Sequence, residues 1–317
     1  MRCAVLDDFQ SVALRMADWS PVADRVEVFS VTEHLDEDDL VARIEGCEVV
    51  VVMRERTPFP AGLLERLPRL RLLVTTGPAN SSIDLAAAAA HGVVVCGTPS
   101  ASEPPAELTW ALLLGLARHV VPENAAFRSN GRWQSTVGTD LFGRRLGLLG
   151  LGRIGSRVAT VGLAFGMDVV AWSPNLTEER CAEVGVTRAA SKLALLGTCD
   201  FVSIHLRLGE RSRGLVGREE LAAMKPTAYL VNTSRPAIVD QGALLEALRD
   251  KAIAGAGLDV FPVEPPVAGD PLRSLPNVLA TPHLGYVTRR NYEEHYFPYV
   301  VDDIRRFLDG APVRTLG

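Results

Sequence analysis

The chain has 317 residues, a length that at roughly 100–200 residues per domain indicates two domains. Apolar residues make up 47% and charged residues 22%, a composition that excludes disordered, collagen-like and low-complexity proteins. The net charge of -5 lacks the basic excess of a nucleic-acid-binding protein, and no apolar run approaches the roughly 20 residues of a membrane span, so we expect neither nucleic acid nor membrane as a partner.

The N-terminus and the cysteines bear on the compartment. Asp7 and Asp8 interrupt the first apolar run, where a secretory signal would continue, so we expect a cytoplasmic protein. The cysteines are odd in number and widely spaced, at Cys3, Cys47, Cys96, Cys181 and Cys199. This pattern fits neither a disulfide framework nor a CxxC metal site, so we expect reduced packing residues and no metal site.

Short β-branched runs alternate with helical patterns through the first 98 residues. The predicted strands are Cys3–Leu6, Val26–Phe29, Val49–Met53, Leu70–Val74 and Val93–Val95. Between the last two, an alanine-rich helix starts at Ile83 and ends at Gly92. This alternation predicts an α/β domain with a doubly wound parallel sheet.

A second α/β series follows a long apolar helix, which Glu103-Pro104-Pro105 opens and which runs to Arg118. Its predicted strands are Leu146–Leu149, Asp168–Trp172, Phe201–Ile204, Tyr229–Val231 and Leu258–Val260. A last helical segment, Asn291–Leu308, could return to the first domain. We therefore expect one domain at 1–98, completed by 286–317, and a second at 99–285.

A glycine-rich turn joins the first strand of the second series to a helix. Gly150 permits a tight turn, Gly152 lets the backbone approach a pyrophosphate, and Gly155 allows close packing of helix against strand. Arg153 and Ile154 open the helix, whose first amides would face the phosphates. In this strand-turn-helix setting the motif predicts dinucleotide binding.

The end of the next strand bears on which dinucleotide is bound. An acidic residue about 20 positions after the turn would bind the ribose hydroxyls, but this chain has Ser173 there. Without a carboxylate nothing repels a 2′-phosphate, yet Pro174 and Asn175 supply no cation to pair with one. NAD and NADP both stay open, with a slight expectation of NAD.

Three further segments carry a resemblance: Asn232–Asp240, Gly257–Pro265 and Thr281–Gly285. Together with the glycine turn, in this order, they resemble the D-isomer-specific 2-hydroxyacid dehydrogenase family. The resemblance implies two doubly wound parallel-sheet α/β domains. Residues 99–285 would form a Rossmann dinucleotide-binding domain, and 1–98 with 286–317 a flavodoxin-like substrate domain.

The resemblance also implies roles for single residues. Arg235 would bind the carboxylate of the substrate with its planar fork, His283 would exchange a proton with the substrate oxygen, and Glu264 would orient the imidazole. Asp259 and Thr109 would lie near the nicotinamide. His205 is interpreted as structural.

The sequence differs from the usual family pattern in the loop that is expected to bind the substrate. Gly77, Pro78 and Ala79 open a turn, Gly77–Ser82, that differs from the usual family sequence, so the identity of the substrate cannot be transferred. Arg54 follows a predicted strand end, where open α/β sheets bind ligands, and is either a contact for an anionic substrate or a solvated arginine paired with an acid such as Glu55.

The resemblance predicts an enzyme that transfers hydride between a nicotinamide cofactor and a small 2-hydroxy or 2-oxo acid. Two alternatives stay open: a formate- or phosphite-oxidising enzyme on the same fold, and a nicotinamide-sensing binding protein of the corepressor kind. Family members usually form dimers, so we expect a homodimer, with Trp133–Leu141 as part of the contact.

Overall fold

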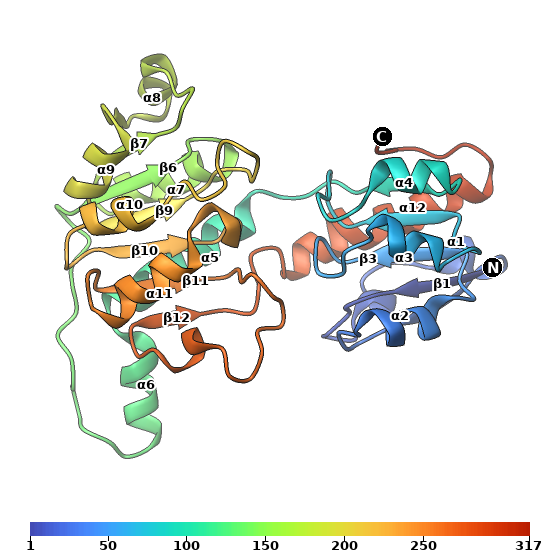
Figure 1. The fold of residues 1–317 in the computed structure, drawn as a ribbon, viewed down its shortest axis with the longest axis horizontal. Helices are drawn as coiled ribbons and strands as arrows, with labels where there is room; N and C mark the ends of the chain where they lie inside the picture. Colours follow the sequence, from blue (N-terminus) through green and yellow to red (C-terminus); the bar gives the residue numbers. More distant parts are fainter. The chain divides into compact units, whose positions relative to one another are not determined.

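The computed structural model describes residues 1–317, and the chain divides into two compact units. Unit 1 comprises Met1–Ala101 and Val287–Gly317, and unit 2 comprises Ser102–Tyr286 (Figure 1). Neither unit contains a helix with the length and apolar character needed to span a membrane. The assignment of functional domains at 98/99 and 285/286 stays a prediction.

Unit 1 is built on a sheet of five parallel strands in the order β2-β1-β3-β4-β5. The strands are β1 Arg2–Val5, β2 Glu27–Ser30, β3 Val49–Val52, β4 Leu72–Thr75 and β5 Val94–Gly97. The helices are η1 Ala13–Arg15, α1 Ser20–Ala23, α2 Glu37–Ile44, α3 Ala61–Glu65, α4 Leu85–Ala90 and, after a π-helical turn η4 at Asn291–Tyr296, α12 Phe297–Leu308. This strand order is that of flavodoxin-like folds.

Local sequence explains where the elements of unit 1 begin and end. The Asp36 and Asp84 side chains accept hydrogen bonds from the first-turn amides of α2 and α4, which satisfies donors that the helix leaves unpaired. Gly92, with φ of 71°, follows α4 in the left-handed conformation that glycine favours. The central strands β3 and β4 are buried on both faces, and Val49–Val52 of β3 are all fully buried, whereas the edge strand β2 is exposed or half-buried.

The C-terminal segment completes unit 1. Phe297, Val300 and Ile304 of α12 are fully buried, and α12 contacts β4. Beyond the helix, Thr315 forms an antiparallel bridge with Cys96, and the Leu316 amide donates to the Val95 carbonyl at 2.8 Å. Residues 287–317 therefore belong to the core of the unit that begins the chain.

Unit 2 is built on seven parallel strands in the order β12-β11-β10-β9-β6-β7-β8. The strands are β6 Arg145–Leu149, β7 Asp168–Trp172, β8 Thr187–Arg188, β9 Phe201–Ile204, β10 Tyr229–Asn232, β11 Gly255–Leu258 and β12 Val278–Ala280. The helices are α5 Glu103–Ala117, α6 Val120–Arg128, α7 Arg153–Ala164, α8 Glu178–Val184, α9 Lys192–Thr198, α10 Arg218–Ala223 and α11 Gln241–Arg249, with single turns η2 Pro236–Ile238 and η3 Pro271–Ser274.

Counted from β8, the first six strands of unit 2 have the Rossmann order 3-2-1-4-5-6, and β12 extends that sheet. The predicted fold class, two doubly wound parallel-sheet α/β units, is confirmed. All five cysteines are buried and unpaired, in keeping with packing residues.

Candidate active site

The glycine turn of unit 2 joins β6 to α7, and each glycine meets a different requirement. A Cβ on Gly150, whose φ is 106°, would lie 2.7 Å from the His205 carbonyl oxygen, and a Cβ on Gly155 would lie 2.2 Å from the Gly150 carbonyl oxygen. Gly152, at the N-cap of α7, has open space on its Cβ side. Two glycines therefore allow close packing and the third leaves the approach to the helix N-terminus free, as pyrophosphate binding requires.

A pocket of about 290 Å³ opens beside this turn. It is lined by Gly150, Leu151, Gly152, Ser173, Asn175, Leu176, Thr177, Arg180, His205, Leu206 and Arg207. Ser173, the residue that follows β7, lies in this lining as the Rossmann pattern predicts. Sequence reasoning missed Arg180, because it lies on α8, seven positions beyond Ser173 and outside any local motif.

His283 and Glu264 form a close pair in unit 2. His283 Nδ1 lies 2.6 Å from Glu264 Oε2, and the side chains are only 16% and 22% exposed. The other carboxylate oxygen of Glu264 accepts the Phe261 amide at 2.8 Å, so the backbone holds the carboxylate in place. With Nδ1 directed at Glu264, Nε2 is the ring nitrogen that can serve a substrate.

Asp259, at the end of β11, is fully buried and fastens the loop that carries His283. Its Oδ1 accepts the Thr281 hydroxyl at 2.7 Å and the Leu284 amide at 2.7 Å, and its Oδ2 accepts the Gly285 amide at 2.9 Å. Burial raises the pKa of Asp259, and these hydrogen bonds act in the opposite direction. Asp259 thus positions the His283 loop, and its expected place near a nicotinamide stays a prediction.

Arg235 lies in a loop that follows β10 and is ordered by Asn232. The Asn232 side chain accepts the Ser234 amide at 3.0 Å and donates to the Arg235 carbonyl at 3.1 Å. Arg235 Nη1 donates to the Ser234 carbonyl at 2.8 Å, and Pro236 opens the turn η2 directly after it. The backbone course at the arginine is therefore set by a buried asparagine and a proline.

Parallel pairing brings the loops of Arg235, Asp259 and His283 to one edge of the unit 2 sheet. Asn232 is in register with Leu258, and Leu258 with Ala280, so β10, β11 and β12 end side by side. Thr109 of α5 joins this edge, because its buried hydroxyl lies 2.9 Å from the Thr233 hydroxyl. The carboxyl edge of an open α/β sheet is where such folds bind ligands.

His205 has a packing role. Its Nε2 lies 2.9 Å from the Ser203 hydroxyl, and its carbonyl is the group that Gly150 approaches. Burial lowers the pKa of His205 to about 4, which keeps the imidazole neutral at physiological pH. These contacts agree with the structural interpretation of this histidine.

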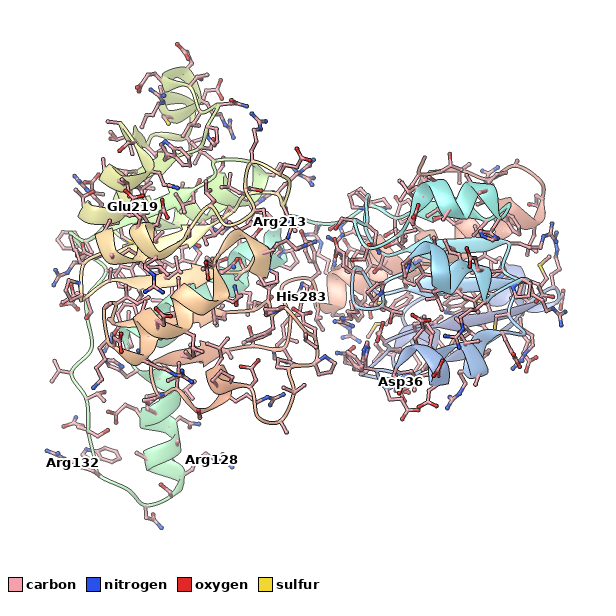
Figure 2. The ribbon with its side chains drawn as sticks, viewed as in Figure 1. Asp36, Arg128, Arg132, Arg213, Glu219 and His283 are labelled. Carbon is pink, nitrogen blue, oxygen red and sulfur yellow. The ribbon has the colours of Figure 1, made fainter.

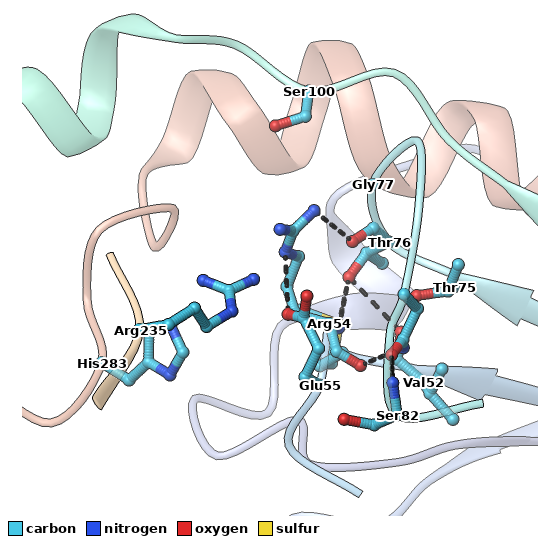
Figure 3. A network of polar contacts seen from close by, with 12 residues as sticks. Val52, Arg54, Glu55, Thr75, Thr76, Gly77, Ser82, Ser100, Arg235 and His283 are labelled. Carbon is cyan, nitrogen blue, oxygen red and sulfur yellow. Dashed lines mark hydrogen bonds and ion pairs between the residues drawn. The ribbon is translucent and has the colours of Figure 1, made fainter. Parts of the chain in front are cut away.

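In unit 1, Arg54 and Gly77 lie together after β3 and β4. Arg54, with φ of 58°, donates from Nη1 to the Thr76 carbonyl at 3.4 Å and lies 3.6 Å from Glu55. A Cβ on Gly77 would lie 1.8 Å from Arg54 Nη1, so a side chain at this position would displace the end of the arginine from where it lies (Figure 3). The Arg54 side chain is only 14% exposed and its expected pairing with Glu55 is present, whereas its expected contact with an anionic substrate stays a prediction. Pro78 and Ala79 are exposed.

Comparison with known proteins gives one matching family model. Residues 110–285 match "D-isomer specific 2-hydroxyacid dehydrogenase, NAD binding domain". The chain is 37% identical over 268 residues to D-3-phosphoglycerate dehydrogenase of Bacillus subtilis, an alignment that covers 84% of this chain and 50% of that protein. It is 42% identical over 236 residues to glyoxylate reductase of Aeropyrum pernix, covering 72% of this chain and 70% of the reductase.

A solved structure gives the same picture across the full length. Phosphoglycerate oxidoreductase from Vibrio cholerae O395 superposes with a TM-score of 0.92 at 37% identity, covering 98% of this chain and 100% of that one. The chain nevertheless spans only about half the length of the Bacillus phosphoglycerate dehydrogenase that it matches.

Proposed function

The chain belongs to the D-isomer-specific 2-hydroxyacid dehydrogenase family, and on this premise we propose that it transfers hydride between a nicotinamide dinucleotide and a small 2-hydroxy or 2-oxo acid. The observation that carries the proposal is the 2.6 Å contact between His283 and Glu264, in the same unit as the open glycine turn. An imidazole paired with a carboxylate that a backbone amide holds in place is a typical arrangement for acid–base catalysis.

The proposed division of labour follows from the chemistry of each side chain. The dinucleotide supplies the hydride acceptor or donor. Arg235 binds the substrate carboxylate, for which a permanently charged planar fork is suited. His283 Nε2 gives a proton to the substrate oxygen in reduction and takes one in oxidation.

The remaining groups position these two residues and the dinucleotide. Glu264 keeps the ring oriented through Nδ1, and Asp259 holds the loop in which the ring sits. Gly150, Gly152, Arg153, Ile154 and Gly155 receive the pyrophosphate. Thr109 and Asp259 are proposed near the nicotinamide and Ser173 near the adenosine ribose.

We assign the substrate domain to 1–98 with 286–317 and the dinucleotide domain to 99–285. Within the substrate domain, Arg54 and the turn Gly77, Pro78 and Ala79 are the proposed contacts to the acid. Arg54 is preorganised for this role because Thr76 and Glu55 already hold its guanidinium.

We propose a homodimer formed through α6 and the segment that follows it. This segment projects from the body of unit 2, with Arg128 and Arg132 near its tip (Figure 2). α6 has no buried residue, and large apolar side chains are exposed here: Phe127 by 68%, Trp133 by 74% and Val137 by 93%. Clustered exposed apolar side chains of this kind support protein association.

The dimer is tested by light scattering at micromolar concentration. A dimer mass for the wild type and a monomer mass for Trp133→Asp with Val137→Asp supports the proposal. A monomeric wild type contradicts it.

The activity is tested by following absorbance of the reduced nicotinamide with a panel of 2-oxo acids and both dinucleotides. Turnover of a 2-oxo acid is the expected result. Turnover of formate or phosphite alone assigns the chain to the alternative chemistry, and dinucleotide binding without any turnover assigns it to the sensing class.

A further inference from the structure

The pocket beside the glycine turn contains cations but no acid. Of its lining residues, Arg180 and Arg207 carry positive charge, and none is Asp or Glu. The N-terminus of the twelve-residue helix α7 adds positive potential at the turn. Ser173 stands where a carboxylate would bind the ribose hydroxyls and repel a phosphate on them.

Arg180 is held firmly over the turn. Its Nη2 donates to the Ser156 hydroxyl at 2.7 Å and its Nε donates to the Leu151 carbonyl at 3.4 Å, which ties α8 to the start of α7. Its Nη1 donates to Glu183 at 2.9 Å. A guanidinium has five N–H groups, so one on each terminal nitrogen is left after these contacts.

The ion pair between Arg180 and Glu183 lies at the protein surface. Both side chains are exposed, by 41% for Arg180 and 64% for Glu183, and exposed pairs of this type contribute little free energy. Glu183 is also absent from the pocket lining, whereas Arg180 is part of it. Of the two charged groups in this pair, the guanidinium is therefore the one that lines the pocket.

Neutral donors and a second cation complete the lining. Ser173 and Asn175 follow β7, and Arg207 follows β9 at the opposite side of β6 in the strand order. Arg207 is exposed. The pocket thus offers hydroxyl, amide and guanidinium groups, a set that suits a phosphate monoester.

We propose that this pocket binds the 2′-phosphate of NADP(H), with Arg180 as its main partner, so that the chain prefers NADP(H) to NAD(H). The inference rests on the proposed function in one respect, that the turn binds a nicotinamide dinucleotide. It replaces the sequence-based expectation of NAD, whose premise was that no cation lies beside Ser173. The cation comes from α8 rather than from the residues next to the strand.

Direct binding tests the proposal without turnover. The dissociation constants of NADP⁺, NAD⁺, 2′,5′-ADP and 5′-AMP are measured by titration calorimetry on the full chain. We expect NADP⁺ and 2′,5′-ADP to bind roughly 10-fold to 100-fold more tightly than their counterparts without the 2′-phosphate, as a charge-assisted contact provides.

Two variants and a control assign the preference to residues. Arg180→Gln is expected to remove most of the 2′-phosphate advantage and leave NAD⁺ binding within about threefold. Ser173→Asp, which adds a carboxylate to the lining, is expected to reverse the preference. The control Arg188→Gln removes an exposed arginine of the same unit that is paired with Glu178 outside the pocket, and is expected to change neither ratio.

The wild-type binding results distinguish failure of the proposed NADP(H) preference from failure of the proposed function. If the wild type binds NAD⁺ as tightly as NADP⁺, the inference is wrong and the proposed function stands. If it binds neither dinucleotide, the proposed function fails. If Arg180→Gln binds neither because the turn is disturbed, the Ser173→Asp ratio decides: a reversed preference supports the inference and an unchanged one overturns it.

Discussion

The carboxyl edges of the two parallel sheets each place an arginine just beyond a strand end, in contrasting surroundings. In unit 1, Arg54 lies over Gly77 with Glu55 and the Thr76 carbonyl as partners (Figure 3). The Asn80 side chain donates to the Arg54 carbonyl at 2.7 Å. In unit 2, Arg235 shares its edge with a histidine paired to a carboxylate. The strand topology provides the position in both cases, and the neighbouring loops decide the chemistry.

The contrast shows that the carboxyl edge of a parallel sheet can carry side chains of different chemistry in the two units. The edge of unit 1 orders its side chains against one another, as the Asn80 bonds to Arg54 and to the Thr75 hydroxyl illustrate. The carboxyl edge of unit 2 carries an imidazole, which can exchange a proton, and a guanidinium, which can bind a carboxylate. Substitutions at the two edges should therefore differ in size and in kind.

The largest effect is expected for His283→Ala. Removing the proton donor and acceptor should lower kcat/KM for a 2-oxo acid roughly 10²-fold to 10⁴-fold. The dissociation constant of the dinucleotide should stay within twofold, and His91→Ala, at an exposed helix end in unit 1, serves as control. Full activity in His283→Ala would return this histidine to a structural role.

Arg235→Lys is expected to lower kcat/KM by roughly a hundredfold, because a compact ammonium cannot reproduce a bidentate fork on a carboxylate. Steady-state kinetics and titration calorimetry measure the two effects separately. The assignment is wrong if the variant turns over normally and chiefly loses affinity for the dinucleotide.

Glu264→Gln should lower kcat by roughly tenfold, because the amide oxygen can still accept the Phe261 amide while the charge beside the imidazole is lost. The double variant with His283→Ala should be no slower than His283→Ala alone, since Glu264 acts through the ring. Fully additive losses in this cycle would show that Glu264 acts independently of His283.

Arg54→Gln probes the edge of unit 1. We expect KM for the acid to rise roughly threefold to tenfold, with kcat and dinucleotide affinity unchanged, because the group contributes binding rather than chemistry. Arg66→Gln, which removes an exposed arginine paired with Glu37 and Asp38 in the same unit, is the matched control. Equal behaviour of the two variants would remove Arg54 from the substrate site.

The smallest effect concerns stability alone. Asp303 of α12 is fully buried beside Arg314, and burial raises its pKa from an ordinary 3.8 to about 7. Between these values the folded chain holds a proton that the unfolded chain has lost, so this group makes stability fall as pH rises from about 4 to 7. Asp303→Asn should abolish that fall, a change in Tm of a few degrees measured by calorimetry across the pH range.

Asp302 serves as a control, because its pKa is shifted in the opposite direction to that of Asp303. The Arg314 hydrogen bond lowers its pKa, so its contribution is present at neutral pH and is lost as the solution is acidified. Asp302→Asn should therefore lower Tm at pH 7. A pH profile of Tm that is the same in wild type and Asp303→Asn would contradict the assignment of the titration to Asp303.

Most strands that sequence patterns predicted are buried on both faces, because burial in a parallel sheet selects continuous apolar runs such as Val49–Val52. The predicted strand β2 is an exception, with exposed and half-buried side chains, and β11 runs from Gly255 to Leu258 instead of the predicted Leu258–Val260. The strands β8 and β12 were not predicted. They have only two and three residues, and their side chains are exposed or half-buried, so no apolar run marks them.

The residues of the candidate site likewise divide into those that a local sequence motif marks and those that none marks. Gly150, Arg235 and His283 lie in short motifs whose local order can be read directly. Arg180 and the partners of Asp259 could not be predicted, because their roles depend on where α8 and the loop after β12 come to lie. Side-chain position relative to a distant segment is a property of packing, which a local motif does not encode.

The return of the chain to unit 1 also has a consequence during synthesis. On the ribosome, residues 1–101 emerge first but lack α12 and the Leu316 contact that complete their core. Residues 102–286 must be made before these arrive, which at typical translation speeds takes roughly 10–40 s. By the end of that interval all the strands of unit 2 have been made, whereas unit 1 still lacks α12 and leaves uncovered the apolar face of β4 against which α12 packs.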